Sequence, residues 1–137
     1  MFVLDTNVFS ELRKARGRAD PGVVAWVHGQ SADALFLSVV TILELETGVA
    51  RVERRDSEQG RMLRSWLEER VLIEFADRVL PINVAVARCA ARLHVPDPRP
   101  ERDALIAATA ITRGMTIVSR NERDFAGAAV VNPWSVG

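Results

Sequence analysis

Side chains that bind transition metals through sulfur or imidazole are scarce in this chain of 137 residues. The single cysteine, Cys89, excludes a disulfide within the chain and any cysteine-based metal site. Only His28 and His94 are available as imidazole ligands, so a histidine-rich zinc centre is not expected. A metal ion in this protein would therefore be bound by carboxylates, which favours Mg²⁺ or Mn²⁺.

The chain also lacks an excess of either charge and any long apolar run. Eighteen basic residues balance eighteen acidic ones, which excludes a uniformly basic coat for nucleic acid but leaves room for a local basic patch. No segment approaches the ~18 apolar residues of a membrane helix, and the first residues lack the basic start of a secretory signal. We therefore expect a cytoplasmic protein without a membrane segment, folded as a single domain over residues 1–137.

Short apolar runs alternate with segments of helical period along the sequence. This alternation predicts an α/β fold in which parallel strands are joined by right-handed crossovers. Pro81 lacks a backbone N–H group, so the third strand is expected at an edge of the sheet. The expected strands are 2–4, 35–39, 79–82, 115–119 and 130–131, and the expected helices are 7–14, 21–29, 41–55, 57–70, 84–93 and 101–113.

Four acidic residues fall beside the carboxyl ends of predicted strands or at the start of a helix, where ligands of α/β proteins bind. If the first, second and fourth strands are neighbours, these four carboxylates converge. Two carboxylates about 4 Å apart repel by roughly 4 kcal/mol at an effective dielectric constant near 20, and a divalent cation removes that repulsion. Such a site suits metal-assisted attack of water on a phosphodiester. The four residues are Asp5, Glu44, Asp103 and Asp124.

Each acid also has a purely structural interpretation. Asp5 could cap the helix that follows it, and Asp103 suits the positive end of a helix dipole. The sequence from Thr41 to Glu44 fits a capping box, and the local pattern alone favours this role for Glu44. Asn121 is likewise expected to cap a short helix that contains Asp124. The position of all four acids at one predicted edge of the sheet is what favours a functional site.

Several segments, in this order along the chain, resemble a PIN-domain ribonuclease, and most of all the VapC-type toxins of toxin–antitoxin pairs in their FitB-like branch. The resemblance implies a three-layer α/β/α fold with a central, mostly parallel sheet of four to five strands. It also implies Mg²⁺- or Mn²⁺-dependent cleavage of an RNA substrate, inhibition by a small antitoxin protein, and pairing as a homodimer. The resembling segments are residues 2–7, 38–41 with Glu44 and Gly48, 103–110, 119–121 with Asp124 and Phe125, and 132–134.

The resemblance also assigns roles to individual residues. It implies that Asp5 and Asp103 are the main metal ligands and that Glu44 and Asp124 complete the catalytic cluster. It implies that three polar residues support this cluster, namely Thr6, Ser119 and Asn121. Basic residues near these motifs are candidate RNA contacts, or else solvated cations at helix ends: Arg13, Lys14, Arg120 and Arg123.

Two alternatives remain open at this level. A PIN-like module could have lost catalysis and serve only in interactions. A phosphatase or phosphotransferase could use Asp5 as its nucleophile, but haloacid-dehalogenase-like enzymes usually carry a second Asp two residues later, where this chain has Asn7. Receiver-like domains require a lysine late in the chain, whereas the only lysine here is Lys14.

Overall fold

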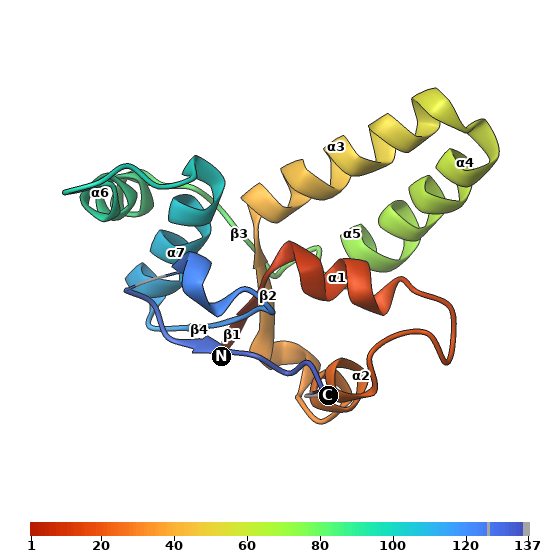
Figure 1. The fold of residues 1–137 in the computed structure, drawn as a ribbon, viewed down its shortest axis with the longest axis horizontal. Coiled ribbons are helices and arrows are strands. Elements are labelled where there is room, and N and C mark those ends of the chain that lie inside the picture. Colours follow the sequence, from red (N-terminus) through yellow and green to blue (C-terminus); the bar gives the residue numbers. More distant parts are fainter. Residues whose placement is uncertain (126, 136–137) are drawn as a thin grey trace.

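Five parallel strands form one central sheet in the computed structural model, which describes residues 1–125 and 127–135 (Figure 1). The first strand of the chain lies in the middle, because the order is β3-β2-β1-β4-β5. All pairings in the sheet are parallel, and the expected place of the third strand at an edge is confirmed. The strands are β1 (Phe2–Leu4), β2 (Leu35–Ser38), β3 (Val79–Leu80), β4 (Thr116–Val118) and β5 (Val130–Val131).

Helices follow the strands much as the apolar periods predict. The prediction of one regular helix over residues 57–70 is wrong near its end, where a wider, π-helical turn spans Leu67–Val71. Leu67 and Val71 are both buried, so packing against the core sets the course of the chain here. The helices are α1 (Thr6–Leu12), α2 (Pro21–His28), α3 (Val39–Arg55), α4 (Ser57–Trp66), α5 (Leu72–Glu74), α6 (Val84–Leu93) and α7 (Glu101–Arg113), with 3₁₀ turns at Ala32–Ala34 and Glu122–Phe125. None of them, within the described residues, is long and apolar enough to cross a bilayer.

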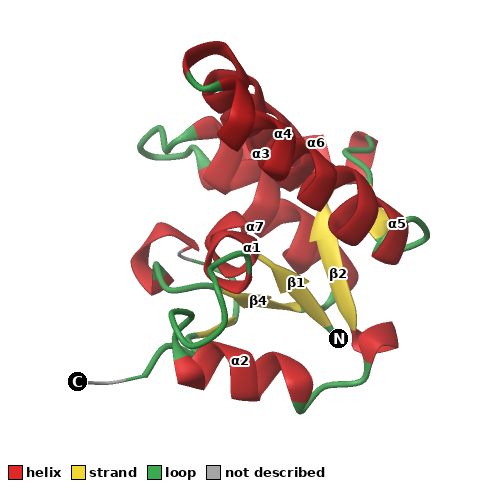
Figure 2. Cartoon of the chain, turned by 90° about the vertical axis from the view of Figure 1, so that its right-hand side faces the viewer, coloured by secondary structure: helices red, strands yellow, loops and turns green. Residues whose placement is uncertain are grey.

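Helices cover both faces of the sheet, which gives three layers (Figures 1 and 2). Successive residues of a strand point to opposite faces. Val3 and Ile117 therefore pack with Ile106 of α7 on one face, whereas Leu4 and Val118 pack with Val8 of α1 on the other. This confirms the predicted α/β/α architecture and leaves the carboxyl ends of β1, β2 and β4 together at one edge.

Helices α3 and α4 lie side by side and extend beyond the sheet (Figures 1 and 2). Arg64 of α4 joins them, because its guanidinium lies 2.8 Å from Glu46 and 3.0 Å from Glu53 of α3. Hydrogen bonds from Arg64 to these carboxylates raise the pKa of the guanidinium further above its usual range. Gly60 permits the close approach, since a Cβ atom there would lie 2.5 Å from the Cα atom of Glu53.

The last described residues are bound to α1 and to the segment after it. Glu11 is 6% exposed, and its carboxylate accepts hydrogen bonds from the backbone N–H of Asp20 (2.9 Å), Lys14 Nζ (3.0 Å) and Trp134 Nε1 (3.3 Å). The Asp20 N–H and the Lys14 ammonium lower the pKa of Glu11. Asp20 in turn accepts a hydrogen bond from the backbone N–H of Ser135 at 3.0 Å. Helix α1 is thereby held from the far end of the chain.

Two glycines of the α3–α4 pair should respond in opposite ways to alanine. In Gly60→Ala the new methyl group meets backbone atoms of Glu53, so the free energy of unfolding is expected to fall by about 1–3 kcal/mol. In Gly48→Ala the methyl group meets no atom within 4 Å, so the higher helix propensity of alanine should raise that free energy by up to about 1 kcal/mol. Urea unfolding followed by circular dichroism measures both changes. Equal effects of the two substitutions would contradict the close approach at Gly60.

Candidate active site

Asp5 stands where β1 ends and α1 begins, and its carboxylate is fixed from two sides. Its Oδ1 accepts a hydrogen bond from the backbone N–H of Thr6 at 2.8 Å, and its Oδ2 accepts one from Ser119 Oγ at 2.7 Å. Ser119 directly follows β4, the parallel neighbour of β1. Asp5 is therefore the N-cap of α1, as its structural interpretation predicts, and it also lies at the edge of the sheet expected for a functional site.

Glu44 does not form the expected capping box. The hydroxyl of Ser38 caps α3 by accepting a hydrogen bond from the backbone N–H of Val40 at 3.0 Å. The helix thus begins before Thr41, which is buried within it. Glu44 lies in the second turn, where its Oε1 accepts a hydrogen bond of 2.6 Å from Thr6 Oγ1. This contact turns Glu44 toward the residues that follow β1.

The other two acids come from the second half of the chain. Asp103 lies partly buried in the first turn of α7, and Asp124 is exposed in the 3₁₀ turn after β4. Asp103 feels the negative charges of both Asp124 and Glu44, and Asp5 feels those of Glu44 and Asp103. The structure therefore brings the four predicted acids into one electrostatic cluster. It lies at the carboxyl ends of the neighbouring strands β1, β2 and β4.

The acid cluster (Asp5, Glu44, Asp103 and Asp124) disfavours full ionisation. Burial raises the pKa of Asp5 to about 6, with a smaller contribution from the charges of Glu44 and Asp103, although hydrogen bonds from Ser119 and Thr6 oppose the rise. Burial, then the charges of Asp124 and Glu44, also raise the pKa of Asp103. Arg102 lies 3.9 Å from Glu44 and is itself half exposed, so it compensates little of this charge.

The oxygen atoms at this edge suit a hard cation. Among the described residues, no group of three or more acid, histidine or cysteine side chains is arranged so that it could hold a metal ion as it stands. Mg²⁺ needs no such cage, since it retains several waters and takes one or two carboxylates. Asn7 adds an independent indication: its side-chain Oδ1 is buried without a hydrogen-bond partner, while its Nδ2 donates to Ser119 Oγ at 3.2 Å. A neutral oxygen left unpaired beside buried carboxylates is a fitting cation ligand.

Asn7 is the residue of this site that the sequence interpretation missed as a participant. Its spacing from Asp5 gave no signal, because residues two apart do not face each other at a helix start, and only the contact of its Nδ2 with Ser119 Oγ places it at the site. Asn121, in contrast, contributes its backbone, because its N–H donates to Ser119 Oγ at 3.0 Å. Asn121 precedes the 3₁₀ turn, and its backbone carbonyl accepts a hydrogen bond from the Asp124 N–H at 3.1 Å. The structure describes no hydrogen bond from the Asn121 side chain to this turn.

The four predicted basic contacts differ in their surroundings. Lys14 is paired with Glu11 at 3.0 Å, which neutralises its charge. Arg120 and Arg123 line a surface depression of about 330 Å³ beside Asp124, and the Arg120 guanidinium lies 6.0 Å from the centre of the Trp134 ring. Arg13 is exposed at the end of α1 and lines a depression that begins at the acid cluster.

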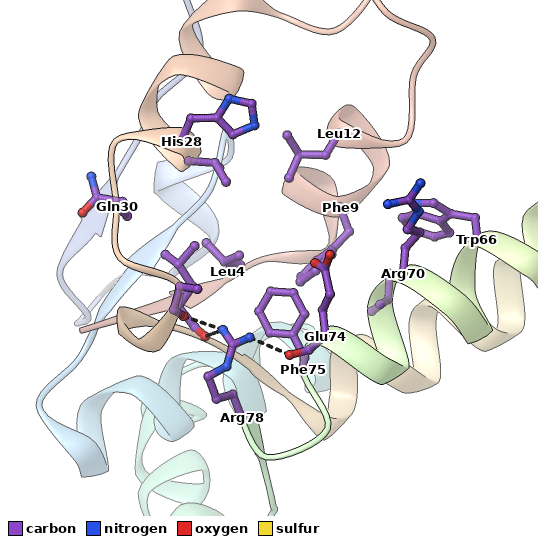
Figure 3. Close-up of a pocket in the computed structure, with 14 residues that line it drawn as sticks. Leu4, Phe9, Leu12, His28, Gln30, Trp66, Arg70, Glu74, Phe75 and Arg78 are labelled. Atoms are coloured by element: carbon purple, nitrogen blue, oxygen red, sulfur yellow. Dashed lines mark hydrogen bonds between the residues drawn. The ribbon is translucent and has the colours of Figure 1, made fainter.

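A second, apolar pocket of about 380 Å³ lies beside α1, α2 and α5 (Figure 3). Phe9, Trp66 and Phe75 form part of its wall. Arg78 at its rim donates hydrogen bonds to the carbonyl oxygens of Leu35 (2.9 Å) and Glu74 (2.6 Å). No member of the acid cluster lines this pocket, so the cluster's chemistry takes place elsewhere.

The raised pKa of Asp5 predicts a pH-dependent effect of Asp5→Asn on stability without metal. The native state binds the proton of Asp5 more tightly than the unfolded chain, whose pKa is near 3.8, so wild-type stability falls as the pH rises from about 4 to 6. Above that range the ionised, buried carboxylate destabilises the fold by on the order of 3 kcal/mol. Near pH 7 in EDTA, Asp5→Asn should therefore have a higher midpoint urea concentration of unfolding than wild type.

This advantage of Asp5→Asn should shrink toward pH 4 and disappear near pH 3, below both pKa values, where the wild-type carboxyl is protonated in the native and the unfolded state. Asp33→Asn is the matched control, since Asp33 is exposed and lies before β2, and it should change stability little at either pH. A variant Asp5→Asn that is less stable than wild type near pH 7 would show that the carboxylate is not under electrostatic strain.

Comparisons with known proteins agree with this geometry. The chain matches the PIN domain family over residues 2–131. It is 38% identical to VapC ribonuclease Y4jK of Sinorhizobium fredii over 98% of both chains, and 35% identical to Toxin FitB of Neisseria gonorrhoeae over 98% of this chain and 99% of that one. The crystal structure of FitAcB from Neisseria gonorrhoeae superposes with a TM-score of 0.88 at 34% identity and covers 99% of this chain and 100% of that one. With its parallel sheet and its acids at the carboxyl edge, the chain belongs to the PIN domain family.

Proposed function

We propose that this chain is a metal-dependent endoribonuclease, folded as one PIN-like domain over residues 1–137, and that it is the toxin of a toxin–antitoxin pair in the cytoplasm. The observation that carries the proposal is the acid cluster at the carboxyl edge of the sheet, with its raised pKa values at Asp5 and Asp103. The names of the similar proteins, a VapC ribonuclease and a FitB toxin, support both the activity and the biological role.

Asp5 and Asp103 would hold Mg²⁺ or Mn²⁺, with Glu44, Asp124 and the free oxygen of Asn7 available to complete the ligands. A bound cation would supply charge compensation for the acids and the phosphate, and activation of a water molecule for attack on phosphorus. The chain's own residues orient these ligands. Ser119 fixes Oδ2 of Asp5, and Thr6 fixes Oε1 of Glu44.

Neither histidine is available for proton transfer at this site. His28 lines the apolar pocket, and His94 Nδ1 accepts a hydrogen bond from the backbone N–H of Arg99 at 3.0 Å. Carboxylates are therefore the protein groups that can take up a proton from the attacking water. Asp5, with its pKa near 6, is held by two hydrogen bonds, whereas Glu44 is partly exposed and accessible.

A small antitoxin protein is the proposed partner, because the similar proteins include a toxin by name. Its expected effect is to cover the acid cluster and keep RNA away from it. The resemblance also favours a homodimer. RNA is the proposed substrate, on account of the ribonuclease relative and of the suitability of clustered carboxylates for phosphodiester hydrolysis.

One observation favours the alternative of a silent interaction module. The described residues hold no ready-made group of three metal ligands, so the acids would have to move to bind a cation together. Against this, all four acids are retained and Asn7 Oδ1 has no internal partner. A metal titration separates the two functions, since only an intact site should be stabilised by Mg²⁺.

The purified protein should cleave RNA in Mg²⁺ or Mn²⁺ and lose cleavage in EDTA. We expect Asp5→Asn to reduce the cleavage rate at least about 100-fold, because it removes a charged ligand at the centre of the cluster. Mg²⁺ should raise the melting temperature of wild type and not that of Asp5→Asn. A panel of tRNAs and unstructured RNAs, resolved on denaturing gels, measures the cleavage.

Asp5→Asn, prepared identically, is also the control for contaminating nucleases, and Asp33→Asn, an exposed aspartate, is the control for the substitution itself and should cleave as wild type does. Equal cleavage by wild type and Asp5→Asn would mean that the acid cluster is not the active site. Absence of both cleavage and stabilisation by metal would instead support the interaction module.

A further inference from the structure

A groove leads away from the acid cluster between α1 and the α3–α4 pair. Its first part, of about 320 Å³, begins at Thr6 and Glu44 and continues past three arginines. A second depression of about 390 Å³ adjoins it. The two parts share the side chains Arg13, Val52, Arg55 and Leu63, so they form one continuous surface feature. We call it the arginine groove, after Arg13, Arg51 and Arg55.

These three arginines carry charge that the described part of the chain does not neutralise. Each is exposed, and none has an ion pair or a hydrogen bond from its side chain to another described residue. The basic residues nearby differ, since Lys14 is paired with Glu11 and Arg64 is paired with Glu46 and Glu53. Positive charge therefore gathers in the groove although the whole chain is neutral.

Two acids also face the groove. Glu44 stands at the end that meets the acid cluster, and Asp56 stands at the other end, where its Oδ1 accepts a hydrogen bond from the backbone N–H of Gln59 at 3.1 Å. Between them the polar wall is made mainly by the arginines. An anionic chain that reaches the acid cluster along this path would meet repulsion at the cluster and attraction just beside it.

The spacing and the remaining wall suit a polynucleotide. Arg51 and Arg55 are four residues apart on α3, so they lie one turn, about 6 Å, from each other on the same side of the helix. Arg13 faces them from the end of α1. Trp66 and Leu63 supply an aromatic and an apolar surface in the same groove. Alternating cationic and aromatic contacts are how proteins bind single-stranded nucleic acid without reading its sequence.

We propose that the arginine groove binds the backbone of single-stranded RNA next to the bond that is cut, with Arg13, Arg51 and Arg55 in contact with phosphates. This rests on the proposed function, which makes RNA the substrate. It assigns binding to Arg51 and Arg55, which the sequence motifs do not include, and it removes Lys14 from the predicted contacts. An acidic protein segment is the competing occupant, and the experiment below distinguishes it.

The test measures binding of a fluorescent, mixed-sequence single-stranded RNA as a function of salt, in an Asp5→Asn background that does not cut it. Each phosphate contact contributes about −0.7 to the slope of log affinity against log salt concentration. Arg51→Gln/Arg55→Gln should therefore reduce the steepness of the slope by about 1.4, so that binding near 0.1 M salt weakens about 25-fold if the affinities of the two proteins converge near 1 M salt. Arg51→Lys/Arg55→Lys should retain most of the slope, because the charges remain.

Arg88→Gln/Arg92→Gln is the matched control, since it removes two exposed arginines at the same spacing on α6, away from α3 and α4 (Figure 1). It should leave the slope unchanged. An equal loss in both pairs, or no loss in the groove pair, overturns the proposal. Binding of polyglutamate is measured in parallel. Loss of polyglutamate binding with RNA binding intact would assign the groove to a protein partner and also overturn it.

Cleavage by the same variants without the Asp5 change separates this proposal from the proposed function. Groove variants should raise KM and leave kcat nearly unchanged. Asp5-dependent cleavage that is insensitive to the groove pair would overturn the groove and leave the nuclease intact. RNA binding that depends on the groove, in a protein that never cleaves, would contradict the nuclease and support the groove.

Discussion

The hydrogen bond from Ser119 Oγ to Asp5 Oδ2 joins the central strand β1 to its neighbour β4 at the point where both end. Asn7 Nδ2 and the Asn121 N–H donate to the same serine hydroxyl, so one small buried residue organises the loops after β1 and after β4. These hydrogen bonds hold the Asp5 carboxylate at the edge of the sheet, although burial raises its pKa and so disfavours its ionised form. The acid cluster thus depends on a carboxylate that the fold holds in an unfavourable environment.

The acidic and basic residues of this chain are equal in number, but they are not evenly mixed over the molecule. Many charged side chains are used to join elements: Arg64 connects α3 to α4, and Glu11 connects α1 to the last described residues. The acids at the carboxyl edge have little such pairing, since the described contact is the one of 3.9 Å between Glu44 and the half-exposed Arg102, and the arginines of the groove have no ion pair among the described residues. A neutral chain can therefore present a strongly acidic centre next to a basic groove, which is the arrangement a nuclease needs.

The sequence predicted the fold well, because short buried strands and capped helices have strong local signals. It predicted the places of Asp5 and Asp103 for the same reason, while their catalytic roles stay predictions. It failed where a distant contact decides the local structure. Glu44 fits a capping box by pattern, but Ser38 caps the helix and Thr6 from another element binds the glutamate. Arg51 and Arg55 belong to no recognisable sequence motif. Their proposed role becomes visible only in the folded structure, where Arg13, 38 or more positions away along the chain, lines the same groove.

The order of the strands has a consequence for synthesis of the protein on the ribosome. The central strand β1 is made long before its neighbour β4, Ser119 and Asp124, which lie far along the chain from it. The Trp134 contact to Glu11, which holds α1 in place, comes later still. A nascent chain therefore cannot assemble the acid cluster until Asp124 has been made. A cell that makes a nuclease of this topology is thereby protected from its activity until that point of elongation.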